Sequence, residues 1–138
     1  MTKYLVDKSA LARASQPAVR QRLEEVFSGD EIFTCPLVDL EVLYSARSPS
    51  EYEHWWASRH AGYETIPLTP RVGERALEVQ RQLAERSHHR GASLPDLLIA
   101  ACAETQDAVV LHYDADYDLI AEVTTQPVEW VVPKGACH

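Results

Sequence analysis

The fold of this chain is decided by the stretch Ala108–Asp116, which reads AVVLHYDAD. Its first four residues are apolar without interruption, and such a run is typical of a strand that is buried on both faces of a parallel sheet. Acidic residues follow soon after the run. Because ligands of open parallel sheets bind beyond the carboxyl ends of the strands, the stretch predicts an α/β fold with an acidic site at one edge of its sheet.

Short apolar runs alternate with helical patterns along the rest of the chain. Strands are predicted at residues 4–6, 31–35, 63–66, 108–111 and 128–132. Helices are predicted to start at residues 10, 17, 36, 51, 70, 94 and 117. Ser9 is the predicted N-cap of the first helix, and Ser50 with Glu53 resembles a capping box for the fourth. The alternation indicates right-handed crossovers and a mostly parallel sheet.

The composition of the chain argues against several classes of protein. The chain has 138 residues, enough for a single domain expected to span 1–138, and no apolar run reaches the roughly 18 residues of a membrane helix. No secretory signal is visible, so a cytoplasmic protein without a membrane partner is expected. The five glycines form no phosphate-binding loop, so a nucleotide cofactor is not expected. The net charge of −8 argues against holding nucleic acid by bulk attraction, but clustered active-site acids compatible with a nuclease account for part of it.

Four acidic residues stand where an α/β chain brings them together. Asp7 and Asp114 each follow a predicted strand. Glu41 lies near the apolar face of its helix, and Asp96 opens a strongly apolar helix. Carboxylates that converge without cationic partners repel one another, and the usual relief is a hard divalent cation with oxygen ligands. Because Mg²⁺ or Mn²⁺ held in this way commonly serves phosphate chemistry, the set predicts a metal centre that acts on phosphate esters.

Each acid also has a structural interpretation. Asp7 can cap the next helix, Glu41 can lie at the solvent rim, and Asp96 can be a first-turn carboxylate that the helix dipole favours. Asp116 can cap the following helix or assist the metal. Ser9 can donate a hydrogen bond to a carboxylate or contact a water bound to the metal.

Four parts of the sequence together resemble the PIN domain, and most of all the VapC toxins of bacterial toxin–antitoxin pairs: Leu5–Leu11, Glu41, Leu94–Ala100 and His112–Ala121. The similarity covers essentially the whole chain. It implies a PIN-like three-layer α/β/α sandwich with a central, mostly parallel sheet. It also implies a Mg²⁺- or Mn²⁺-dependent endoribonuclease that cleaves RNA, forms a homodimer and is neutralised by a VapB-type antitoxin.

The resemblance also assigns roles to individual residues. The implied catalytic quartet is Asp7, Glu41, Asp96 and Asp114. The implied metal ligands are Asp7, Asp96, Asp114 and Asp116, and Ser9 takes the place of the family's supporting hydroxyl residue. Two positions depart from the family pattern: Tyr117 stands where Phe is frequent, and His112 stands where Thr or Ser is common. Hydroxyl assistance at position 112 is therefore in doubt, and a buried structural histidine is preferred there over a substrate contact.

Two other functions are compatible with the pattern. A phosphohydrolase or phosphotransferase would use Asp7 as a covalent nucleophile, but Ser9 replaces the second Asp expected there, and Lys8 and Lys134 are poorly placed to assist. A non-catalytic PIN-like interaction module would function through its binding surface alone. For the toxin, the acidic pocket predicts an antitoxin that inserts Arg or Lys among the acids and lays an amphipathic helix in an apolar groove, using Trp55 or Trp56.

Overall fold

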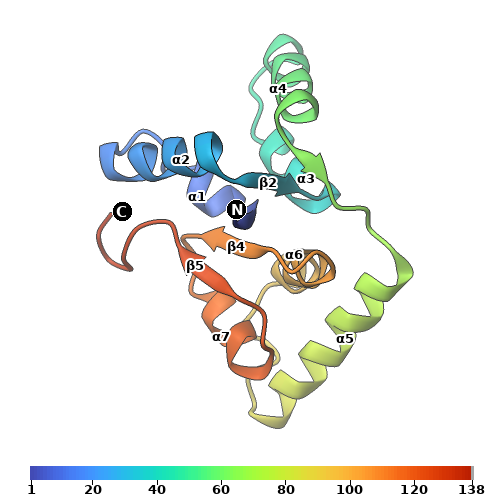
Figure 1. Ribbon diagram of the computed structural model, residues 1–138. Coiled ribbons are helices and arrows are strands. Elements are labelled where there is room, and N and C mark those ends of the chain that lie inside the picture. The colour runs from blue at the N-terminus through green and yellow to red at the C-terminus, as the bar shows by residue number, and fades with distance from the viewer. Residues whose placement is uncertain (138) are drawn as a thin grey trace.

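The computed structural model describes residues 1–137, and in this range five parallel strands form one sheet (Figure 1). The strands are β1 (Lys3–Val6), β2 (Glu31–Thr34), β3 (Glu64–Thr65), β4 (Val109–His112) and β5 (Val128–Trp130). Their order in the sheet is β3-β2-β1-β4-β5. The chain therefore adds β2 and β3 on one side of β1, and then crosses to the other side of β1 to add β4 and β5. This reversal creates a topological switch point between the carboxyl ends of β1 and β4.

The described helices connect the strands and cover both faces of the sheet. They are α1 (Lys8–Leu11), α2 (Pro17–Gly29), α3 (Pro36–Tyr44), α4 (Pro49–Gly62), α5 (Pro70–Glu85), α6 (Leu94–Thr105) and α7 (Asp116–Val123). In Figure 1, α1 and α2 lie on one side of the sheet, α5, α6 and α7 lie on the other, and α4 projects away from it. The predicted three-layer α/β/α sandwich with a parallel sheet is confirmed.

Alternation along the central strands divides the core into two clusters. Leu5 of β1 and Val110 of β4 are register partners, and both belong to the cluster formed with α3, α5, α6 and α7. Tyr4 and Val6 face the other way and pack with α1 and α2. All four side chains are buried, as period-two alternation requires of strands covered on both faces. The two layers hold β1 and β4 rigidly at the switch point.

The starts of α1 and α4 differ from the sequence prediction, and a proline accounts for the second. Proline occupies the first or second position of five helices, so the cap is the residue just before that first turn. Ser48, rather than Ser50, accepts the hydrogen bond from the backbone N–H of Glu51 and caps α4. Asp7, rather than Ser9, caps α1, which begins at Lys8.

Two further observations concern the cysteines and the lengths of the helices. Cys35 and Cys102 are both buried with free thiols in the larger core cluster, as expected of small apolar residues. Among the helices of residues 1–137, none has both the length and the apolarity needed to cross a bilayer.

Candidate metal centre

The acidic residues gather at the switch point between β1 and β4. Asp7 follows β1 directly, and its backbone N–H donates to the carbonyl of Leu111 at 2.9 Å, so the strand pairing carries through to this residue. Asp96 lies in the first turn of α6, where Ser93 caps the helix. Both acids are buried, with 3% of Asp7 and 5% of Asp96 exposed. Buried carboxylates at such a position need hydrogen-bond donors or a cation.

Both carboxylate oxygens of Asp7 accept hydrogen bonds. Oδ2 accepts from the backbone N–H of Ser9 at 3.1 Å and from the Ser9 hydroxyl at 2.6 Å. Oδ1 accepts from the hydroxyl of Tyr117 at 2.8 Å. The Ser9 hydroxyl oxygen in turn accepts from the backbone N–H of Tyr113, which ties the start of α1 to the loop after β4. Asp7 thus performs the capping role and also stands within the acidic cluster.

Asp96, Asp114 and Asp116 each offer one carboxylate oxygen, and the three oxygens lie within 4.8 Å of one another. Asp114 Oδ1 accepts from the backbone N–H of Asp116, and Asp116 Oδ2 accepts from the backbone N–H of Ser93. Asp96 Oδ2 is buried and has no hydrogen-bond donor within residues 1–137. A buried oxygen without a donor, beside two further carboxylates, is the environment that a divalent cation with oxygen ligands satisfies. The residues present therefore fit Mg²⁺ or Mn²⁺.

The protonation of Asp96 reflects this crowding. Burial, and next the negative charges of Asp7 and Asp114, raise the pKa of Asp96 to about 8. Burial also raises the pKa of Glu41 on α3, and the charge of Asp7 adds to the increase while that of Lys8 opposes it. Glu41 therefore lies within electrostatic reach of the cluster, and it is only half-buried. The fold thus brings the four predicted acids and Asp116 to one end of the sheet.

Two residues near the site have roles that the sequence left open. His112 is fully buried, and its Nδ1 accepts from the backbone N–H of Asp114 at 3.0 Å, so it orients the chain that carries that acid. Burial lowers the pKa of His112, which favours the neutral imidazole. Both carboxylate oxygens of Asp118, in the first turn of α7, accept from the indole N–H of Trp130 at 3.2 Å.

Sequence reasoning did not predict the ion pair between Asp39 of α3 and Arg59 of α4. Oδ1 of Asp39 accepts from Arg59 Nε at 2.6 Å and from the hydroxyl of Thr34. The Arg59 side chain is 6% exposed and also donates to Thr34. The helical pattern of α4 gave no signal that its arginine is buried. Asp39 is thus satisfied by cationic and hydroxyl donors, whereas Asp96 keeps an oxygen without a donor.

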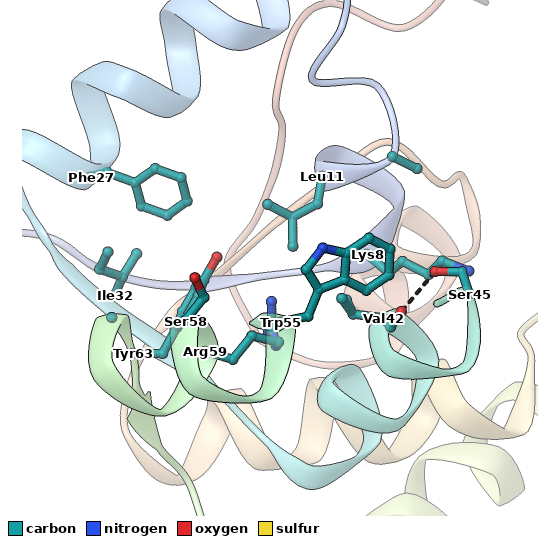
Figure 2. A pocket seen from close by; sticks show the side chains of 12 residues that line it. Lys8, Leu11, Phe27, Ile32, Val42, Ser45, Trp55, Ser58, Arg59 and Tyr63 are labelled. Atoms are coloured by element: carbon teal, nitrogen blue, oxygen red, sulfur yellow. Dashed lines mark hydrogen bonds between the residues drawn. The ribbon is translucent and has the colours of Figure 1, made fainter. Parts of the chain in front are cut away.

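An apolar groove of about 740 Å³ lies between the α1–α2 pair and the α3–α4 pair. Figure 2 shows Leu11 and Phe27 facing Trp55 across it, with Val42 at its base. Lys8 lines the groove as well, one residue after Asp7. One end of the groove therefore borders the acidic site. Trp56 does not line the groove, because its ring stacks with those of Tyr52 and His60 on α4.

Comparison with known proteins identifies the class to which this fold and site belong. The family profile described as PIN domain matches residues 4–123. The chain is 47% identical over 133 residues to ribonuclease VapC51 of Mycobacterium tuberculosis, covering 96% of each chain, and 43% identical to ribonuclease VapC21 of the same organism, covering 97% of each. The chain therefore belongs to the PIN-domain family and to its VapC group.

Solved structures give the same fold at low sequence identity. DNA-bound VapBC from Salmonella typhimurium matches with a TM-score of 0.75 and 14% identity, covering 96% of this chain and all of that one. VapBC-1 from nontypeable Haemophilus influenzae matches with a TM-score of 0.75 and 11% identity, covering 94% of this chain and 98% of that one. At this identity, the two matches support the fold alone.

Proposed function

We propose that this chain is a metal-dependent endoribonuclease that hydrolyses RNA phosphodiester bonds and acts as the toxin of a toxin–antitoxin pair. The main support is twofold: Asp96, Asp114 and Asp116 each offer an oxygen within 4.8 Å of the others at the switch point of a parallel sheet, and Asp96 has a buried oxygen, Oδ2, without a donor in residues 1–137. Identity of 47% to a chain named ribonuclease VapC51 supports the choice of RNA as substrate.

The free oxygens indicate which residues would hold Mg²⁺ or Mn²⁺. Asp96 Oδ2, together with one oxygen each of Asp114 and Asp116, would be the ligands, and Asp7 would stand beside them with both oxygens already hydrogen-bonded. When bound, the cation supplies Lewis acidity that polarises a phosphoryl oxygen and lowers the pKa of water. Asp7 keeps the local field negative and is held in place by Ser9.

Glu41 is best placed to move the proton. It is half-buried at the edge of the cluster, and its raised pKa lies closer to neutral than that of an ordinary carboxylate. A general base works best when its pKa approaches the working pH. Glu41 would therefore accept the proton of the attacking water as the water approaches the phosphorus in line with the leaving oxygen. As the new bond forms, the bond from phosphorus to the leaving oxygen breaks, and the leaving oxygen takes a proton from solvent. The proton on the Glu41 carboxylate then returns to solvent.

The hydrogen bonds of Asp7 argue against the phosphohydrolase alternative. A covalent nucleophile needs one oxygen free to approach phosphorus. Oδ2 of Asp7 accepts two hydrogen bonds from Ser9, and Oδ1 accepts one from Tyr117, in a residue that is 3% exposed. Attack by Asp7 would require breaking one of these bonds and opening the buried site.

Cleavage of RNA by the purified protein tests the proposal. We expect cleavage with Mg²⁺ or Mn²⁺, none in excess EDTA, and loss of cleavage in Asp114→Asn, which keeps the shape but removes a charge. Asp107→Asn is the matched control, because Asp107 is exposed and has a φ of 53° that Asn tolerates well. Undiminished cleavage in Asp114→Asn or in EDTA would contradict the assignment of the metal centre. A pure wild-type protein that cleaves no RNA with either metal ion would instead favour the non-catalytic module.

The proposed protein partner is a VapB-type antitoxin, and the groove between α1–α2 and α3–α4 is its proposed binding site. The groove is apolar and concave, as the apolar face of an amphipathic helix requires. Because Lys8, the residue after Asp7, lines the groove, a chain leaving it on that side would reach the acidic cluster, where an antitoxin Arg could pair with two carboxylate oxygens. Expression of the chain should arrest growth, and co-expression of the cognate antitoxin should relieve the arrest. A well-expressed, soluble wild type that is harmless would contradict the toxin assignment.

A homodimer is also part of the proposal. Leu40 and Tyr44 lie one turn apart on α3 and are 64% and 89% exposed, and Leu94 at the start of α6 is also exposed. Large apolar side chains grouped on a surface commonly mark an interface. Light scattering after size-exclusion chromatography should give twice the mass of one chain, and Leu40→Glu with Tyr44→Glu should give a monomer. A wild-type monomer at micromolar concentration would contradict the dimer.

A further inference from the structure

The hydroxyl of Tyr117 lies between two of the acids. Tyr117 belongs to the first turn of α7 and is fully buried. Its hydroxyl lies 2.8 Å from Asp7 Oδ1 and 3.1 Å from Asp96 Oδ1. Its ring packs against that of His112, with the centroids 4.9 Å apart. One phenol therefore joins three elements of the site: the end of β1, the start of α6 and the start of α7.

This contact determines how the Asp96 carboxylate is turned. Because Oδ1 faces the Tyr117 hydroxyl, Oδ2 is the oxygen left without a donor within residues 1–137, and Asp96 is grouped with Asp114 and Asp116. Asp7 is fixed from two sides, by Tyr117 on Oδ1 and by Ser9 on Oδ2. A hydrogen-bond donor placed between two buried carboxylates also reduces the repulsion between them. The hydroxyl thus separates the oxygens used for internal bonding from those left for a ligand.

We propose that Tyr117 is a positioning residue of this site, whose hydroxyl sets the orientation of Asp96 toward a divalent cation and holds Asp7 beside it. The inference rests on the metal site of the proposed function and adds a residue to it. Phenylalanine at position 117 would fill the same buried volume but would remove the hydroxyl that lies between Asp7 Oδ1 and Asp96 Oδ1. Partners that orient metal ligands in this way typically contribute about ten- to a hundredfold to metal affinity or activity.

The test compares Tyr117→Phe with Tyr4→Phe. Tyr4 is also buried, but its hydroxyl accepts from Arg22, and it faces the α1–α2 layer. Calorimetric titration with Mn²⁺ alone should show an affinity at least about tenfold weaker in Tyr117→Phe, and wild-type affinity in Tyr4→Phe. Far-UV circular dichroism in EDTA should show that both variants keep the fold, because the ring that packs in the core is retained.

Cleavage kinetics separate positioning from a merely structural role. For Tyr117→Phe, the Mn²⁺ concentration giving half-maximal cleavage should rise by the same factor as the dissociation constant. The KM for RNA should be unchanged at saturating Mn²⁺, and high Mn²⁺ should restore most of kcat. A Tyr117→Phe variant that binds Mn²⁺ as tightly as the wild type would overturn this inference alone. A wild type that binds no Mn²⁺ would overturn the proposed function, and the inference with it.

Discussion

Replacing Asp96 with Asn should stabilise the metal-free protein, and the gain should depend on pH. The pKa of Asp96 rises from its ordinary value of 3.8 to about 8 because of burial and the neighbouring acids. At pH 7 the unfolded chain ionises this carboxyl, so folding must return a proton to it. The stability linked to Asp96 is therefore complete below pH 3.8 and is lost as the pH rises toward 8. Asn carries no such dependence.

The magnitude follows from the same pKa values. The ordinary pKa of the carboxyl, 3.8, lies about three units below pH 7, and each unit is worth about 1.4 kcal/mol. Asp96 therefore reduces the free energy of unfolding at pH 7 by at most about 4 kcal/mol. Local relaxation and water entry reduce such penalties, so the expected gain from Asp96→Asn is about 1 to 3 kcal/mol at pH 7. Near pH 4 the gain should disappear.

Urea denaturation in EDTA at a series of pH values measures this difference. Comparing variant and wild type at each pH cancels the opposite effect of His112, whose lowered pKa makes its own contribution fall as the pH drops below its ordinary value of 6.5. Asp107→Asn should match the wild type throughout. The reasoning is refuted if Asp96→Asn and wild type are equally stable at pH 7, or if their difference is the same at pH 4 and pH 7.

Three further predictions follow from the site, the ion pair and the groove. Mn²⁺ should raise the melting temperature of the wild type as the site fills, with EDTA reversing the rise and Asp96→Asn showing a smaller one, as differential scanning fluorimetry will measure. Arg59→Met should lower the free energy of unfolding in urea by about 3 kcal/mol, because it leaves Asp39 without its cation, and the further change Asp39→Leu should recover part of that loss. Trp55→Ala should weaken inhibition by the antitoxin by at least about tenfold while leaving RNA cleavage intact, as titration of antitoxin into the cleavage assay will show.

Much of the fold could be predicted because local sequence determines it. The apolar runs of β1 and β4 are buried on both faces, and the acids after them must lie together once the strands are adjacent and parallel. Helix starts were less predictable where two candidate caps lie close together. Ser48 and Ser50 differ only in that Ser48 precedes Pro49, and the fixed φ of proline decides between them.

Features that depend on contacts between distant residues could not be predicted. The Tyr117 hydroxyl meets Asp7, a residue 110 positions away in the sequence, and only the packing of α7 against the switch point brings them together. Arg59 reads as one more surface arginine, yet it crosses from α4 to neutralise Asp39 on α3. In both cases the sequence supplies the polar group, and the tertiary packing supplies its partner.

A crystal structure of the wild-type protein soaked with Mn²⁺ tests the central claim most directly, because anomalous scattering locates the ion without reference to activity. The acidic-cluster assignment predicts an anomalous peak about 2.0 to 2.3 Å from Asp96 Oδ2, with oxygens of Asp114 and Asp116 completing the protein ligands and water filling the remaining positions. The peak should be absent in Asp96→Asn. A protein that cleaves RNA in Mn²⁺ but shows no ion at these residues, or binds it elsewhere, would contradict the assignment.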